Sequence, residues 1–155
     1  YFIFKDPEQG RLRYREDNVV DTGGTVRPIY NLTLTGPARE AEYANSVVLS
    51  RSRYTAPADR SLRFYREYFQ PAEEHEIIKH RERYHIRYKG VDFAVNLDHI
   101  QQPPQKQLFA EIKSRTWSRA DAVRKAGLIA ELLEILGSQP EDMLRHEYVD
   151  LFAER

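Results

Sequence analysis

The residues best suited to chemistry are basic side chains that recur at every second position of extended segments, so that each set lies on one face of a strand. The sets are Arg11, Arg13 and Arg15; Arg51 and Arg53; and Lys79, Arg81, Arg83, His85 and Arg87. Clustered arginine and lysine suit a polyphosphate ligand, because guanidinium groups bind phosphate oxygens in pairs.

Two later segments add carboxylates to this pattern. Asp98 shares a strand face with Asn96, and Glu111 shares one with Lys113. Mg²⁺ and Mn²⁺ prefer oxygen ligands, so Asp98 and Glu111 are candidate ligands for a metal that binds together with the anion.

Two arrangements would explain these charged faces. A half-buried antiparallel sheet can turn them toward water. A closed barrel with a polar interior would instead turn them inward, with helices covering its apolar outer side. The crowding of like charges on neighbouring segments favours the barrel, because such crowding is unfavourable unless an anion neutralises it.

The elements that must position these side chains are mostly strands. Period-two patterns and turn residues predict seven strands, at residues 1–5, 11–15, 29–35, 46–54, 76–88, 91–100 and 107–114. Lys89-Gly90 joins the two longest as a tight hairpin. A short helix is expected at 58–69, and a long one follows the Ser118 cap as far as Gly137. Pro140 is expected to open a second C-terminal helix, so the fold class is α+β.

Composition limits the class of protein. A chain of 155 residues fits a single domain, and its net charge of zero provides no global attraction to nucleic acid or lipid. Without cysteine it has no disulfide, a feature that fits a cytoplasmic protein. No apolar run is long enough to span a membrane, and no two of the five histidines have the spacing of a zinc-binding helix. The first residues read as a strand already under way, so we expect a fragment of a longer chain.

Six short motifs follow one another along the chain. They are Tyr1-Phe-Ile-Phe-Lys-Asp-Pro with Gly10-Arg-Leu-Arg-Tyr-Arg15, Leu32-Thr-Leu-Thr-Gly-Pro37, Lys79-His-Arg81 with Tyr84, Val95-Asn-Leu-Asp98, Phe109-Ala-Glu-Ile-Lys113 and His146-Glu-Tyr-Val-Asp-Leu151. In this order they resemble the CYTH family, also called triphosphate tunnel metalloenzymes. Its members include class IV adenylyl cyclases and thiamine, inorganic and RNA triphosphatases.

The resemblance implies an eight-stranded antiparallel barrel with external helices, of which residues 1–155 would supply seven strands. The missing strand is the family's N-terminal Glu-x-Glu-x-Lys segment. The expected phosphate ligands are Arg13, Arg15, Lys79 and Arg81, and Arg51, Arg53 and Lys113 are further expected phosphate-binding residues. Asp98 and Glu111 would hold Mg²⁺ or Mn²⁺. The candidate catalytic residues are Lys79, Arg81 and Glu111.

Several positions depart from the family pattern. Thr35 stands where the family has lysine, and Lys113 stands where it has a second glutamate. The fourth strand has Arg51-Ser-Arg53 where cyclase-type members often carry arginine followed by glutamate. Replacing carboxylates with cations weakens metal binding and strengthens the binding of a bare anion.

The expected function is binding and hydrolysis of an inorganic, nucleoside or thiamine triphosphate with a divalent metal. One alternative is a class IV-type adenylyl cyclase that makes cyclic AMP, which the ending Tyr148-Val-Asp-Leu favours. Another is a non-catalytic module that binds polyphosphate or nucleotide and is attached to an N-terminal P-loop kinase or ATPase. No membrane partner is expected, and a nucleic acid only as an RNA 5′-triphosphate end.

Overall fold

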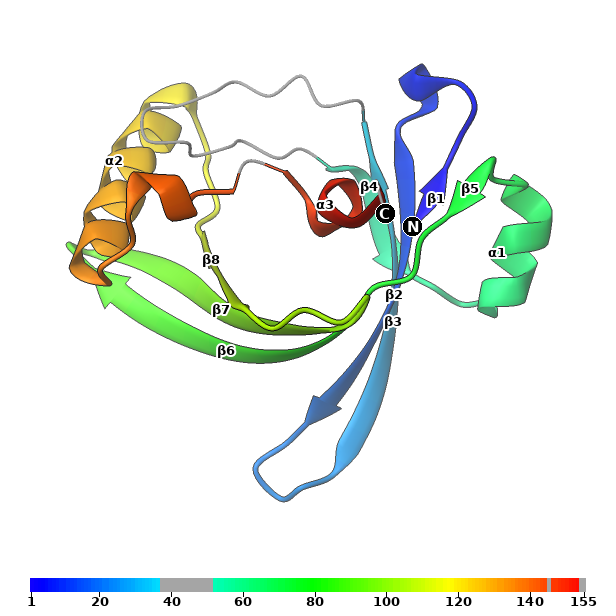
Figure 1. Cartoon of the computed structure of the whole chain (residues 1–155), viewed down its shortest axis with the longest axis horizontal. Helices are drawn as coiled ribbons and strands as arrows, with labels where there is room; N and C mark the ends of the chain where they lie inside the picture. The colour runs from blue at the N-terminus through cyan, green and yellow to red at the C-terminus, as the bar shows by residue number, and fades with distance from the viewer. Residues whose placement is uncertain (37–51, 145, 154–155) are drawn as a thin grey trace. The chain divides into compact units, whose positions relative to one another are not determined.

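The computed structural model describes residues 1–36, 52–144 and 146–153, and these form two compact units (Figure 1). Unit 1 holds residues 1–36 and 52–75, and unit 2 holds residues 76–144 and 146–153. The expected α+β class with antiparallel strands is confirmed. The described strands form a five-stranded and a three-stranded sheet, neither of which closes into a barrel. A single domain over residues 1–155 stays a prediction.

The sheet of unit 1 has the strand order β4-β3-β2-β1-β5. Its strands are β1 (Phe2–Ile3), β2 (Arg11–Val20), β3 (Val26–Thr35), β4 (Ser52–Pro57) and β5 (Glu73–Glu74). A 3₁₀ turn, η1 (Pro7–Gln9), lies between β1 and β2, and the helix α1 (Leu62–Phe69) follows β4.

Unit 1 differs from the sequence-based expectation in several segments. β1 is shorter than the strand expected at 1–5, and β5, which was not predicted, brings the described strands to eight instead of seven. β2 continues beyond residue 15 to Val20, and β3 begins at Val26 rather than at residue 29. The two strands form one long hairpin, because Asp21 closes its turn locally (Figure 1). The backbone N–H groups of Gly23 and Thr25 both donate to Asp21 Oδ1 at 2.9 Å. α1 begins at Leu62 rather than at residue 58, because the hydroxyl of Ser61 caps the helix immediately before Leu62. The expected strand at 46–54 lies outside the described residues as far as residue 51.

The core of unit 1 lies between one face of its sheet and α1. Phe2, Leu12 and Leu32 are buried there against Tyr65 of the helix. Because side chains alternate along β2, the opposite face carries Arg11, Arg13 and Arg15. One face of this sheet is therefore apolar and covered, and the other is cationic.

Unit 2 contains a three-stranded antiparallel sheet in the order β6-β7-β8. The strands are β6 (Ile78–Tyr88), β7 (Val91–Gln102) and β8 (Leu108–Lys113). The predicted hairpin at Lys89-Gly90 is confirmed: both residues have positive φ, 46° and 75°, as a tight two-residue turn requires. This turn pairs Tyr88 with Val91, which sets the register of the whole β6–β7 ladder.

The helices of unit 2 differ in how well the sequence anticipates them. α2 (Arg119–Ile135) begins at the predicted Ser118 cap, whose hydroxyl accepts from the backbone N–H of Asp121 at 3.1 Å. Its Leu128 and Leu132 pack on Val91 and Phe93 of β7. The predicted helix from Pro140 is wrong in extent, since a 3₁₀ turn, η3 (Pro140–Asp142), precedes a short α3 (Tyr148–Ala153). The Asp142 carboxylate accepts from the Gln139 backbone N–H at 3.0 Å and closes that turn.

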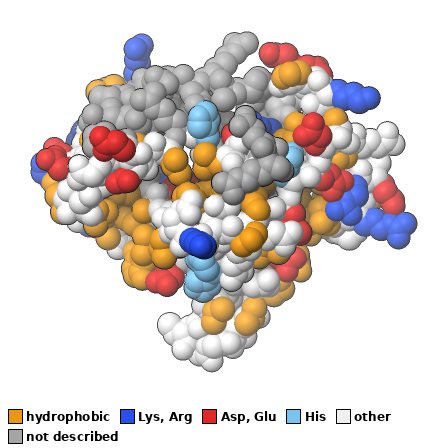
Figure 2. Space-filling view, in the orientation of Figure 1, with side chains coloured by type: hydrophobic (Ala, Val, Ile, Leu, Met, Phe, Trp, Pro, Cys, Tyr) orange, Lys and Arg blue, Asp and Glu red, His pale blue; other side chains and the backbone are white. Residues whose placement is uncertain are grey.

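The surface agrees with the balanced composition. Basic and acidic side chains are interspersed over the face visible in Figure 2, rather than segregated by sign. Within the described residues, no helix combines the length and the apolar character needed to cross a membrane.

Candidate anion-binding site

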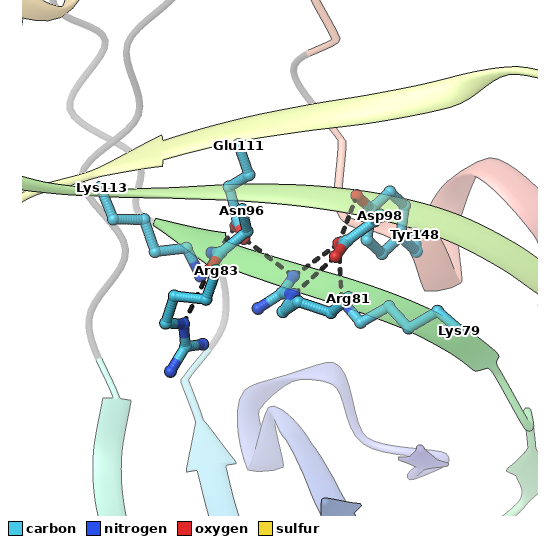
Figure 3. Close-up of polar contacts among 8 residues, drawn as sticks. All are labelled: Lys79, Arg81, Arg83, Asn96, Asp98, Glu111, Lys113 and Tyr148. Atoms are coloured by element: carbon cyan, nitrogen blue, oxygen red, sulfur yellow. Dashed lines mark hydrogen bonds and ion pairs between the residues drawn. The ribbon is translucent and has the colours of Figure 1, made fainter. Parts of the chain in front are cut away.

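Figure 3 shows a group of seven polar side chains on one face of the unit 2 sheet, and we call this group the charged face. They are Lys79, Arg81 and Arg83 of β6, Asn96 and Asp98 of β7, and Glu111 and Lys113 of β8. The register places Arg81 opposite Asp98, and it aligns Arg83, Asn96 and Glu111 across the three strands. The other face of the same strands packs against α2, so the sheet separates an apolar side from a charged side.

Asp98 is the centre of the charged face. Its side chain is fully buried, and it accepts hydrogen bonds from two cations and one hydroxyl. Arg81 donates through Nε and Nη2 at 2.5 Å each, Lys79 Nζ at 2.8 Å, and the hydroxyl of Tyr148 at 2.8 Å. This carboxylate therefore fixes the position of two candidate phosphate ligands and of the helix α3.

The titration behaviour of these groups follows from their contacts. Burial would raise the pKa of Asp98, but the hydrogen bonds from Arg81 and Lys79 outweigh it and lower that pKa to about 2. Burial lowers the pKa of Lys79 by more than the Asp98 hydrogen bond raises it. Burial and the hydrogen bond to Asp98 both raise the pKa of Tyr148, so the hydroxyl remains a donor.

Glu111 is a second anchor for the same cations. Its Oε2 accepts from Arg81 Nη2 and from Asn96 Nδ2, at 3.1 Å each. Its Oε1 pairs with Lys113 Nζ at 2.8 Å. Burial would raise the pKa of Glu111, but the Lys113 and Arg81 charges lower it overall. Arg81 thus bridges both carboxylates of the charged face.

Arg83 differs from its neighbours because its partner is neutral. Its Nε donates to Asn96 Oδ1 at 2.8 Å. In the part of the chain that the structure describes, no carboxylate pairs with its guanidinium group, which extends away from the other labelled side chains in Figure 3. The side chain is exposed. Arg83 is the cation of the charged face whose charge is least compensated.

Aromatic side chains hold α3 beside this face. The ring of Tyr148 meets that of Phe109 edge-on at 5.4 Å and stacks on that of Phe152 at 6.2 Å. Lys79 Nζ lies 4.7 Å from the centre of the Tyr148 ring, where a cation–π attraction adds to the hydrogen-bond network.

The structure brings together five of the predicted site residues: Lys79, Arg81, Asp98, Glu111 and Lys113. It adds Arg83, Asn96 and Tyr148, which were not proposed as site residues. Arg83 and Asn96 were detectable, because they share strand faces with Arg81 and Asp98. Tyr148 carried no such signal, since a helix distant in sequence supplies it.

Two other predicted residues, Arg13 and Arg15, lie on the cationic face of unit 1. Arg13 is opposite Thr33, and its guanidinium carbon lies 6.0 Å from the centre of the Tyr1 ring. The Nε of Arg13 is buried and has no hydrogen-bond partner among the described residues. Arg15 pairs with Asp17 at 2.7 Å. Arg51 and the side chain of Arg53 lie outside the described residues.

The two candidate metal ligands are already engaged. Asp98 accepts from three side chains, and Glu111 contacts three, of which Arg81 is shared with Asp98. Within the described residues, no group of three or more histidine and acidic side chains is arranged to hold a metal. With both carboxylates paired in this way, the charged face fits an anion better than a bare divalent cation. The metal role of Asp98 and Glu111 stays a prediction.

A scan of the chain against protein-family models finds no match, and searches of curated proteins and of solved structures find none either.

Proposed function

We propose that the charged face binds the triphosphate chain of an inorganic, nucleoside or thiamine triphosphate, and that the protein hydrolyses it with Mg²⁺ or Mn²⁺. The observation that carries the proposal is the excess of positive charge on one face of one sheet. Of the seven side chains of the charged face, Lys79, Arg81, Arg83 and Lys113 are cations, and two, Asp98 and Glu111, are carboxylates. Like charges held side by side are unfavourable, and a bound anion would neutralise the charge that the two carboxylates leave uncompensated.

The accessible cations are suited to recognising phosphate. Arg83 is exposed and has only an amide partner, and the Lys113 side chain is 56 % exposed. A guanidinium group can donate two parallel hydrogen bonds to a phosphate, whereas an ammonium group acts as a point charge. Arg83 is therefore the expected first ligand. Asp98 and its three donors, Lys79, Arg81 and Tyr148, form what we call the Asp98 hub, which holds the two cations in place beside Arg83.

Membership of the CYTH family and a closed eight-stranded barrel belong to the same proposal. A crystal structure of the full-length protein with tripolyphosphate tests this part. Strands that close into one barrel around the ligand support it, and a ligand bound outside two open sheets contradicts it.

The engaged carboxylates favour one second candidate, a module that binds polyphosphate or nucleotide without hydrolysing it. Neither Asp98 nor Glu111 is free to bind a bare metal ion or to activate water. The metal of the first proposal therefore has to arrive already bound to the triphosphate. A binding module would need no metal at all.

Calorimetric titration with tripolyphosphate tests binding. Arg83→Gln should weaken binding at least about tenfold, because a hydrogen bond to a charged group contributes about 1.5–3 kcal/mol. Arg124→Gln, on the exposed surface of α2 in the same unit, is the matched control and should bind like the wild type. Equal affinities in wild type and Arg83→Gln would refute the proposed site.

Turnover assays separate hydrolysis from binding alone. With triphosphate and Mg²⁺ or Mn²⁺, Glu111→Gln should lower turnover at least about 10²-fold, the scale for loss of a key electrostatic group. Lys113→Glu should raise metal affinity and turnover, because it adds a carboxylate. Tight binding without turnover in the full-length wild type would establish the binding module, and cyclic AMP from ATP would identify a cyclase.

A further inference from the structure

Two histidines of unit 2 lie directly opposite each other although they are far apart in sequence. The ladder between β6 and β7 pairs His80 with His99. Side chains of directly opposite residues project from the same face, with Cβ atoms about 4.5–5.5 Å apart. We infer that His80 and His99 together bind a first-row transition-metal ion, with Cu²⁺ preferred over Ni²⁺ and Zn²⁺.

Both imidazoles are available as ligands. Both residues are exposed. In the described part of the chain, neither imidazole has a hydrogen-bond or ion-pair partner. A neutral imidazole keeps one unprotonated nitrogen, which is the atom that binds a metal. The pair therefore offers two nitrogen ligands that no other contact occupies.

The surroundings of the pair keep it distinct from the charged face. Successive side chains of a strand alternate between faces, so His80 and His99 lie on the opposite face from Arg81 and Asp98. On that face, Leu108 of β8 is the other neighbour of His99. Glu82, the next residue of β6 on the same face, has its carboxylate 2.5 Å from the Tyr84 hydroxyl. The inference therefore does not depend on the proposed triphosphate site.

The chemistry of the pair selects the class of metal. Imidazole suits Cu²⁺, Ni²⁺ and Zn²⁺, and the affinity of such nitrogen sites is highest for Cu²⁺. Nitrogens bound at about 2.0–2.1 Å lie roughly 3 Å apart around one ion, a separation that directly opposite residues can reach. Water completes the coordination, so this is an exchangeable site rather than a closed structural one. Mg²⁺ is excluded because it requires oxygen ligands.

The two ligands also gain from being on neighbouring strands. Once one imidazole has bound the ion, the sheet holds the other close by at a high effective concentration. Loss of either histidine therefore removes the chelate and leaves an ordinary single-histidine site. Because the ion bridges β6 and β7 in the native state, binding stabilises the fold.

Copper titration of the full-length protein tests the inference. Calorimetry at neutral pH should show one Cu²⁺ per chain above the background of single histidines. Electron paramagnetic resonance should show coupling to two imidazole nitrogens. Cu²⁺ should also raise the melting temperature. His80→Ala and His99→Ala should each weaken this site at least about tenfold and abolish the rise.

His85→Ala is the matched control, since His85 is on the same strand but on the other face, opposite Ala94. It should bind Cu²⁺ with wild-type affinity. His99→Gln retains a polar side chain and reports on ligand loss if His99→Ala disturbs the fold. Wild-type affinity in His80→Ala or His99→Gln, equal loss in His85→Ala, or no Cu²⁺ binding by the wild type would each overturn the inference.

Discussion

The two units use the same layout, but they balance charge differently. Each has a sheet with one apolar face packed on a helix and one face that carries cations. In unit 2, carboxylates of β7 and β8 lie beside the cations of β6, and Asp98 is fully buried among them. In unit 1, Arg13 lies opposite the hydroxyl-bearing Thr33.

In unit 2 a buried carboxylate already holds the cations in place, whereas the ion pair of Arg15 and Asp17 in unit 1 is exposed. A buried carboxylate shared by two cations holds them in fixed positions, and removing it leaves uncompensated buried charge. An exposed pair such as Arg15 and Asp17, each 38 % exposed, is screened by water and contributes little. Substitutions should therefore have large effects in unit 2 and small effects in unit 1.

The largest expected effect comes from the Asp98 hub. Asp98→Asn should lower the free energy of unfolding by about 3–5 kcal/mol, because Lys79 and Arg81 lose their buried counter-charge. The matched change in unit 1, Asp17→Asn, should cost less than about 1 kcal/mol. Urea denaturation of both variants measures the contrast, and equal losses would abolish the distinction between the two units.

Acid should weaken the same hub. The pKa of Asp98 is about 2 in the folded protein, against about 3.9 in an unfolded chain. Because the folded pKa is the lower one, the ionised carboxylate of Asp98 stabilises the fold fully above about pH 4. This stabilisation disappears as the pH falls through about 2. That loss should be about 2–3 kcal/mol. The ¹³C shift of the Asp98 carboxyl group should titrate near pH 2, and a midpoint near pH 4 would show that the carboxylate is not held by its cations.

A smaller effect is expected from the hydroxyl that joins α3 to the hub. Tyr148→Phe keeps the ring contacts with Phe109 and Phe152 but removes the donor to Asp98. It should lower the free energy of unfolding by about 1–2 kcal/mol, since Asp98 retains two cationic partners. Tyr88→Phe removes a hydroxyl that donates to the more accessible Glu131 and should cost less. A greater loss in Tyr88→Phe, measured by the same denaturation, would argue against the hub.

The smallest effect is expected on the cationic face of unit 1. Arg13→Met keeps most of the apolar stem and removes a buried Nε that has no hydrogen-bond partner among the described residues. The free energy of unfolding should change by less than about 1 kcal/mol and can even rise. Thermal and urea denaturation at low salt check this, and a loss above about 2 kcal/mol would show that Arg13 is a structural partner.

Local chemistry made much of unit 2 predictable. The Lys89-Gly90 turn pairs Tyr88 with Val91, and counting back from it places Arg81 opposite Asp98. The same counting pairs His80 with His99, although a search for helical spacing passes over them. Ser118 was recognisable as a cap because its hydroxyl acts only on the next turn of chain.

Contacts from distant segments were not predictable. Tyr148 reaches Asp98 from 50 positions away, and nothing in either local pattern indicates that hydrogen bond. The extension of β2 and β3 was missed because Asp17, Asn18 and Pro28 disfavour strands, while pairing from the Asp21 turn overrides that preference. The sequence predicts Arg81 as a phosphate ligand but does not indicate its ion pairs with Asp98 and Glu111.

Binding of triphosphate to the charged face is tested most directly by NMR. The arginine Nε–H signals are observed during titration with tripolyphosphate at constant ionic strength. The Arg83 signal should shift first and saturate with the calorimetric affinity, and the Arg81 signal should shift with it, because both guanidinium groups belong to the charged face. The Arg124 signal of α2 should stay unchanged. A titration in which Arg83 does not move, or in which Arg124 and other surface arginines move equally, would contradict the account.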